Sequence, residues 1–208
     1  MQKGFFVIVF SLTFWNCFTQ NFKRIENPAV IKNRLEEAHR ETKSFSADFI
    51  ETAHSSMFVK PQKGKGKVYF KKPEKIRWEQ TDLKNQIILL NGKSIRISKG
   101  GKEVTNEQSK IVFKRIQNMM IQMLSGSFLN EKDFKILYYE RNEQIKLHLL
   151  PKNQRLSRYI KRIELLFDKK TLTLLEMTMI EDETEKMVYT FFNVSINKTL
   201  NDSLFNQF

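Results

Sequence analysis

Residues 64–98 contain one alternating run that opens at Gly64-x-Gly66 and a second that turns at Asn91-Gly92, and this pattern constrains the fold more than any other feature of the chain. Alternation places Val68 and Phe70 on one face of a strand, and Ile76 and Trp78 on one face of the next. The segment therefore predicts β-strands that share one apolar face.

Two features inside this segment predict where its strands end. Pro73 cannot donate a hydrogen bond to a sheet, so we expect it at a strand boundary or an edge. Asn91-Gly92, between Leu90 and Ile95, is the strongest short-range signal for a tight hairpin, because both central residues need a positive φ. The segment is predicted to be a meander of antiparallel strands.

The same alternation returns elsewhere in the chain and predicts further strands. In the last of them, one alternating set is predicted to close the sheet: Val188, Thr190, Phe192, Val194 and Ile196. The other strands are expected near residues 45–49, 134–139, 144–149, 163–167 and 175–179.

Two segments have helical periodicity instead. Asn27-Pro28 predicts a helix start, with Asn as N-cap and Pro as the first helical residue, and this helix runs to about Glu41. A central amphipathic helix is predicted to end at Ser125-Gly126. Its apolar positions are Val112, Ile116, Met119, Met120, Met123 and Leu124.

About ten strands, short turns and two helices predict a mainly β fold with helices (α+β). We expect a curved antiparallel sheet, or an incomplete β-barrel, covered by the N-terminal helix and the central amphipathic helix.

Residues 1–19 have the pattern of a secretory signal peptide. Lys3 gives a positively charged start, residues 5–15 form an apolar core, and Cys17-Phe18-Thr19 supplies the residues before a cleavage site. We expect cleavage between Thr19 and Gln20, secretion across an inner membrane into the periplasm, and a single mature domain at 20–208.

Two alternatives to cleavage remain open. A retained signal anchor would fit the absence of charge between Gly4 and Phe22, although the apolar core is shorter than the roughly 20 residues of a spanning helix. Lipidation at Cys17 would need small residues before it, and Phe14-Trp15-Asn16 does not supply them. If cleavage occurs, the one cysteine is lost and the mature chain forms no disulfide.

The chain is strongly basic, with a formal net charge of +13. A nucleic-acid partner is disfavoured, because lysine outnumbers arginine in the densest cluster and the signal directs the chain away from nucleic acid. We favour a solvated outer sheet face, with attraction to anionic lipid head groups or an acidic partner as a second use. The cluster comprises Lys60, Lys63, Lys65, Lys67, Lys71, Lys72, Lys75 and Arg77.

No arrangement in the sequence predicts catalysis. His39, His54 and His148 fall on a helix, a loop and a strand, and no serine lies in a Gly-x-Ser-x-Gly elbow. We therefore expect no enzymatic activity, no catalytic residue, no metal site and no cofactor.

The segment at 64–98 resembles the LolA family of periplasmic lipoprotein carriers. The resemblance rests on Gly64-x-Gly66, then Lys72-Pro73-x-x-Ile76-Arg77-Trp78-Glu79, then Asn91-Gly92. Further matching pieces follow in the same order: Leu124-x-Gly126, Leu150-Pro151, Ile163-x-Leu165-x-Phe167-Asp168, Phe192-Asn193 and Asp202-x-x-Phe205.

This resemblance implies a carrier that hides the acyl chains of lipoproteins between helix and sheet and moves them from the inner to the outer membrane. It implies an inner-membrane ABC transporter as donor and an outer-membrane acceptor, and we expect a monomer. The residues predicted to bind lipid are Phe49, Val68, Phe70, Ile76, Trp78, Ile116, Met119, Met120, Met123, Leu165, Met177 and Met179. Methionine suits such a site because it repacks around guests of varied shape.

Other interpretations stay open. The methionine stripe by itself favours an ordinary core, and only the resemblance favours a lipid site. The cargo could be another acylated lipid. A similar fold also serves as a binding or sensing module for an envelope signalling partner.

The sequence departs from the family pattern at Lys72, where the resemblance implies an arginine that latches a helical lid. Lysine keeps the charge but loses the planar fork of the guanidinium. We expect the Lys72 ammonium, if it latches the lid, to reach carbonyls or a carboxylate of a lid helix. The turn at 181–184 also lacks the usual glycine, and the C-terminal tail is short.

Overall fold

The computed structural model describes residues 21–82, 85–92, 94–104, 129 and 131–208. The predicted signal peptide and the predicted central helix lie outside the described residues.

The described strands form one 12-stranded antiparallel sheet, in the order β1-β8-β9-β10-β11-β12-β2-β3-β4-β5-β6-β7. Strands β12 and β2, which are far apart in the sequence, pair at its centre, with Phe191 opposite Phe49. The strands are β1 (Lys23–Arg24), β2 (Ser44–His54), β3 (Gln62–Lys71), β4 (Lys75–Gln80), β5 (Gln86–Asn91), β6 (Ser94–Lys99), β7 (Lys102–Glu103), β8 (Phe134–Arg141), β9 (Gln144–Pro151), β10 (Arg162–Asp168), β11 (Leu174–Ile180) and β12 (Lys186–Ile196).

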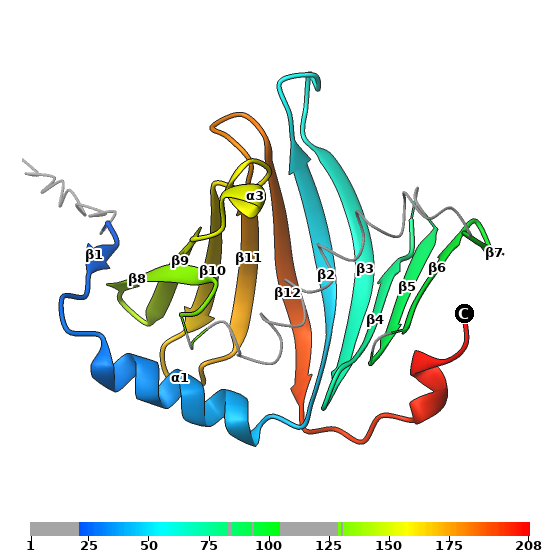
Figure 1. Cartoon of the computed structure of the whole chain (residues 1–208), viewed down its shortest axis with the longest axis horizontal. Coiled ribbons are helices and arrows are strands. Elements are labelled where there is room, and N and C mark those ends of the chain that lie inside the picture. Colours follow the sequence, from blue (N-terminus) through cyan, green and yellow to red (C-terminus); the bar gives the residue numbers. More distant parts are fainter. Residues whose placement is uncertain (1–20, 83–84, 93, 105–128, 130) are drawn as a thin grey trace, which may run out of the picture.

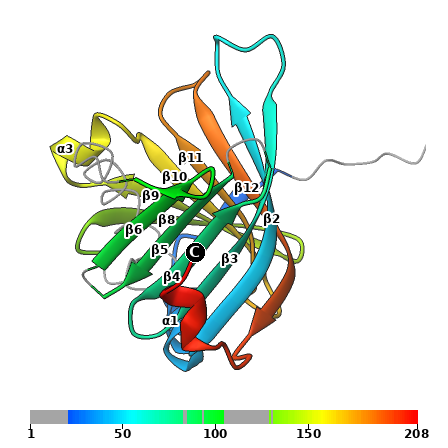
Figure 2. The ribbon, with the colours of Figure 1, turned by 90° about the vertical axis from the view of Figure 1, so that its right-hand side faces the viewer.

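The sheet is strongly curved and open (Figures 1 and 2). The predicted α+β class and curved antiparallel sheet are therefore confirmed. The meander at 64–98 is also confirmed, since β3 pairs β4, β4 pairs β5 and β5 pairs β6. Gly92 has the expected positive φ of 57°, but the prediction was wrong for Asn91, which is the last residue of β5 and pairs with Ser94 of β6, so the turn begins at Gly92.

Helix α1 (Ala29–Glu41) lies across the lower end of the sheet, beneath β8 to β11 in Figure 1. It begins one residue later than predicted, because Pro28 occupies the N-cap position; Asn27 Oδ1 accepts a hydrogen bond from the Ala29 amide at 3.3 Å. Leu35 is completely buried and joins α1 to the core of the sheet. A short helix, α3 (Gln154–Ser157), and a 3-10 helix, η2 (Asp202–Phe205), complete the described elements. Within these described ranges, no helix has both the length and the apolar character needed to cross a bilayer.

The core lies on one face of the sheet, which we call the inner face. Every long strand contributes apolar side chains to it, as alternation requires. In β2, for example, Phe45, Ala47 and Phe49 are buried in this core, and their alternation was predicted from the sequence.

The predicted alternation was wrong for β12. Tyr189 and Phe191 pack in the inner-face core, whereas Phe192 and Ile196 are 43% and 45% exposed. The register with β2 shifts between Phe192 and Ser195, and Asn193 has a φ of 51°. This bulge changes which residues face inward, so Val194 packs on the core although Phe192 does not.

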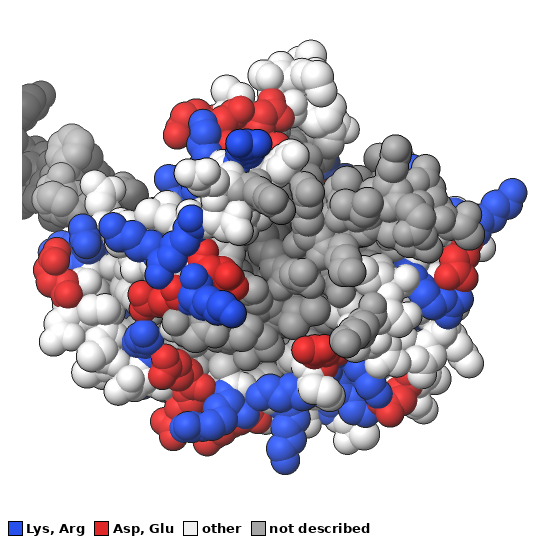
Figure 3. All heavy atoms as spheres, viewed as in Figure 1, with Lys and Arg blue, Asp and Glu red and all other residues white. Residues whose placement is uncertain are grey.

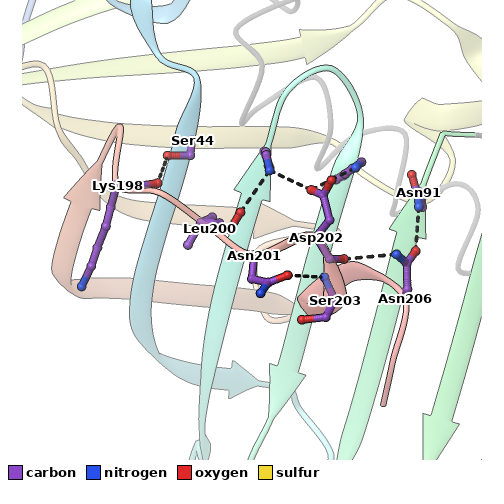
Figure 4. Close-up of polar contacts among 10 residues, drawn as sticks. Ser44, Asn91, Lys198, Leu200, Asn201, Asp202, Ser203 and Asn206 are labelled. Atoms are coloured by element: carbon purple, nitrogen blue, oxygen red, sulfur yellow. Dashed lines mark hydrogen bonds and ion pairs between the residues drawn. The ribbon is translucent and has the colours of Figure 1, made fainter.

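The C-terminal segment 197–208 crosses the opposite, outer face of the sheet (Figures 1 and 4). The Ser44 hydroxyl donates to the Lys198 carbonyl at 2.6 Å, and Lys71 Nζ donates to the Leu200 carbonyl at 3.0 Å. Asp202 forms ion pairs with Lys71 at 2.7 Å and with Lys75 at 3.1 Å. These contacts tie the tail to β2, β3 and β4.

The tail also covers Arg77, which is only 8% exposed. Its guanidinium donates to the Leu204 carbonyl at 3.0 Å and to the Gln207 carbonyl, and it pairs with Glu79. Phe205, at 1% exposed, packs in η2 against β4 and β5. We predicted that the whole basic cluster is exposed to water. This prediction was wrong for Arg77, because the tail covers its side chain.

We predict that Phe205→Ala destabilises the protein by about 3–5 kcal/mol, because a buried aromatic side chain leaves a cavity. Denaturant unfolding measures the change. Phe208→Ala is the matched control: this ring is 40% exposed and stacks under Arg96, so its loss costs less than about 1 kcal/mol. Equal losses in the two variants would contradict the role assigned to Phe205.

Candidate functional site

The inner face is the candidate site. All of the predicted lipid-binding residues that the structure describes lie on it: Phe49, Val68, Phe70, Ile76, Trp78, Leu165, Met177 and Met179. All of these are buried except Met179, which is partly buried against the others. Ile116, Met119, Met120 and Met123 lie outside the described residues.

Aromatic rings dominate the centre of this face. Phe49 and Trp78 are stacked with ring centroids 4.3 Å apart, and Tyr189 meets them edge-on at 5.7 Å and 5.1 Å. Phe191 packs edge-on against Phe49 at 6.4 Å. Sequence reasoning missed Tyr189 and Phe191 because it chose the other alternating set in β12.

Gly66 makes the central stack geometrically feasible. It lies opposite Phe49 in β2 and opposite Gln80 in β4. A Cβ atom there would lie 2.0 Å from the Glu79 carbonyl oxygen and 2.2 Å from Phe49 Cζ. The Phe49 ring therefore covers a backbone position that has no side chain.

A polar group interrupts the apolar surface beside the aromatic rings. Glu51 is only 4% exposed, and Gln80 donates a side-chain hydrogen bond to its carboxylate. Burial, followed by the nearby charge and hydrogen bond of Glu51, raises the pKa of Tyr189 well above its usual range. The inner face thus offers a buried, hydrogen-bonded carboxylate next to Trp78 and Phe49, which the sequence pattern did not reveal.

Tyr138 adds a second polar atom. Its hydroxyl is buried and has no hydrogen-bond partner in the described part of the chain. Burial, with the charges of Glu131 and Glu36, raises the pKa of Tyr138 above its usual range. This hydroxyl stays neutral and retains an unused capacity to hydrogen-bond.

Lys72 connects the sheet to helix α1. Its Nζ donates to the backbone carbonyls of His39 and Arg40 at 2.8 and 2.9 Å. These carbonyls lie in the last turn of the helix, where a cation is favourable. Burial lowers the pKa of Lys72 from its usual value.

A cavity of about 200 Å³ lies next to this helix end. His39, Phe45, Phe167 and Leu174 are among its lining residues. Burial, and secondarily the charge of Lys72, lowers the pKa of His39 to about 4, so the imidazole is neutral near pH 7. The lining is mixed, because Glu41, Thr42 and Asn197 also contribute to it beside the apolar side chains.

The histidines do not form a catalytic group. His39 lies in α1, His54 ends β2, and His148 in β9 lies 3.4 Å from Glu164. Among the residues that the structure describes, no three His, Cys, Asp or Glu side chains gather in a way that could hold a metal ion.

One solved structure with a TM-score above 0.5 shares this fold. An uncharacterised conserved protein of Thermus thermophilus superposes with a TM-score of 0.51 at 9% identity, over 88% of this chain and 94% of that chain. A LolA superfamily protein of Nitrosomonas europaea matches with a TM-score of 0.45 at 12% identity, over 88% of this chain and 99% of that one.

An outer-membrane lipoprotein carrier protein of Coxiella burnetii is 27% identical over 145 residues, which cover 69% of this chain. The match spans 66% of that relative, slightly less than two thirds of its length.

The curved open sheet and its apolar inner face define a binding module. The family model described as outer membrane lipoprotein carrier protein LolA matches residues 40–207, and the chain belongs to this family.

We predict that Gly66→Ala destabilises the protein by about 1–3 kcal/mol, because the new methyl group meets a backbone carbonyl that cannot retreat. Denaturant unfolding measures the loss, and Trp78 fluorescence reports whether the stack is disturbed.

Gly64→Ala is the control for this prediction. A Cβ at Gly64 would approach only the flexible Asp82 carboxylate, at 3.2 Å, so we expect a change smaller than about 1 kcal/mol. If Gly66→Ala were as mild as Gly64→Ala, the close packing of Phe49 would not be a constraint.

Proposed function

We propose that this protein is a periplasmic carrier that shields the acyl chains of lipoproteins and moves them from the inner to the outer membrane. The observation that carries this proposal is the large apolar core on the inner face of the sheet, in a chain that belongs to the LolA family. The curated relative named as an outer-membrane lipoprotein carrier protein supports the same role.

The physical task of such a carrier is shielding, and no bond is made or broken. Each CH₂ group kept from water contributes about 0.8 kcal/mol, so a long acyl chain is held firmly only by a large apolar surface. The rings of Phe49 and Trp78 and the flexible side chains of Met177 and Met179 supply such a surface. An acyl chain would displace contacts among these side chains.

Delivery requires partners at both membranes. We propose an inner-membrane ABC transporter as donor and an outer-membrane acceptor, with a carrier that crosses the periplasm as a monomer after removal of residues 1–19. Release of cargo costs the free energy that was gained when its acyl chains were buried. An acceptor surface or a movement of helix α1 has to supply this free energy.

We propose Lys72 as the latch that holds α1 on the sheet. Its ammonium group satisfies two carbonyls at the end of the helix. Arg34 of α1 also donates to the Lys169 carbonyl at 3.1 Å, and Lys32 pairs with Glu131 at 2.9 Å. These polar contacts lie at the rim, where water can replace them as the helix moves.

We predict that brominated fatty acids quench Trp78. In a Trp15→Phe variant Trp78 is the remaining tryptophan of the two in the chain. Bromine quenches on contact, so quenching places the acyl chain at the central stack, and the unbrominated acid of equal length is the control. Unchanged emission at saturating brominated acid would contradict acyl binding at this face.

Lipoproteins recovered with the protein and identified by mass spectrometry test the cargo itself. A single stoichiometric membrane protein recovered without lipoproteins would instead support a signalling module.

We also predict that Lys72 controls release. Lys72→Arg adds donors in a rigid fork and should slow transfer of a fluorescent acylated cargo to acceptor vesicles, whereas Lys72→Leu should lower transfer because closure is lost. Lys135→Arg, at an exposed position in β8, is the matched control. Parent-like transfer rates in both Lys72 variants would mean that Lys72 only stabilises the fold.

A further inference from the structure

The β2–β3 hairpin has an apolar free end. We call residues 57–59 the hairpin tip; Met57 is 84% exposed, Phe58 41% and Val59 101%. Figures 1 and 2 both show this hairpin reaching beyond the rest of the sheet and beyond the neighbouring β11–β12 turn. Consecutive exposed apolar side chains on a projection mark an interaction site rather than scattered surface residues.

The tip is held in place at its base. One carboxylate oxygen of Glu185, Oε1, accepts hydrogen bonds from the Ser55 hydroxyl at 3.0 Å and from the Ser56 amide at 2.8 Å. The Phe58 amide donates to the Ser55 carbonyl at 3.0 Å, which closes the turn. These hydrogen bonds lower the pKa of Glu185, so the carboxylate remains charged and bonded at neutral pH. A fixed turn presents its apolar side chains at a low entropic cost.

The charges around the tip favour one kind of partner. Lys60, Lys63 and Lys65 follow it, and residues 52–66 include no acidic side chain. Acidic residues nearby are those of the β11–β12 turn, at 181–185, which Figures 1 and 2 show set back from the tip, and Asp82, which accepts a hydrogen bond from the Lys65 amide at 2.6 Å. Figure 3 shows the projecting end as uncharged on the viewed face, with acidic and basic groups below it.

We propose that the hairpin tip docks on an anionic lipid bilayer. Met57, Phe58 and Val59 enter the boundary between head groups and acyl chains, while Lys60 and Lys63 meet lipid phosphates. A narrow projection of consecutive apolar residues can insert into a fluid bilayer. Basic residues directly behind such an apolar end are typical of proteins that bind at the membrane interface. This inference goes beyond the carrier function, because it does not require the inner face to hold lipid.

A fluorescent probe at the tip tests this proposal. On a Cys17→Ser background, Val59→Cys is labelled with nitrobenzoxadiazole and mixed with vesicles of phosphatidylcholine and phosphatidylglycerol. We expect a blue shift and an increase in emission, because the probe leaves water. The control is Val30→Cys, since Val30 is 70% exposed on α1, away from the hairpin in Figure 1. Both proteins carry the same N-terminal segment, so any affinity of residues 1–19 for vesicles is common to both.

Vesicle sedimentation separates the two parts of the contact. Replacing Met57, Phe58 and Val59 together by serine should weaken binding by about tenfold or more. Replacing Lys60 and Lys63 by glutamine should weaken binding to anionic vesicles by about fivefold per lysine, and should leave binding to phosphatidylcholine alone unchanged. The Val30→Ser variant should bind as the parent does.

Several outcomes would overturn the proposal: no spectral change at position 59, equal changes at positions 59 and 30, or vesicle binding that survives the triple serine substitution. Cross-linking from position 59 to a protein in place of lipid would also overturn it. Because the triple variant keeps its inner face, quenching of Trp78 by brominated fatty acid tests the carrier function independently. Loss of vesicle docking and loss of acyl binding are therefore distinguishable.

Discussion

The structure depends on one constraint: every long strand must keep its apolar set on the same face of a single continuous sheet. The pairing of β12 with β2 is the critical join, because it connects the two halves of the sheet through Phe191 and Phe49. A slip of one residue there would turn one half's apolar side chains toward water. The bulge near Asn193 adjusts the register only beyond this join, so the central pairs remain aligned.

The two faces of the sheet are stabilised by different interactions. The inner face uses aromatic and aliphatic packing around Phe49 and Trp78, with Gly66 leaving room for the ring. The outer face carries basic residues, and there the C-terminal tail supplies carbonyls and the Asp202 carboxylate. Hydrogen bonds of Lys71 and Lys75 lower the pKa of Asp202, which keeps these contacts charged at neutral pH. A basic surface thereby becomes an attachment site for the tail.

This division of interactions suits a binding module. Apolar packing on the inner face is not directional, so side chains such as Met177 can repack around a guest. The contacts that join α1 to the sheet combine the buried Leu35 with polar bonds at the rim, among them those of Lys72. Polar bonds at a rim exchange easily with water, whereas Gly66 and the stacked rings fix the middle of the sheet.

Local patterns in the sequence determined most strands and turns and the faces of β2 to β4, because side-chain direction in a strand follows a strict period of two. The resemblance to the LolA family, and not the local pattern, indicated the lipid-site residues and a role for Lys72 at a helix. The tertiary structure alone decided the face of β12, where a bulge breaks the period, and the burial of Arg77, whose carbonyl partners in the tail lie more than a hundred residues away. It likewise placed Glu51 beside Tyr189 and set the tip at 57–59 apart from the core. Local periodicity specifies the direction in which a side chain points, but only the assembled sheet specifies which residues it contacts.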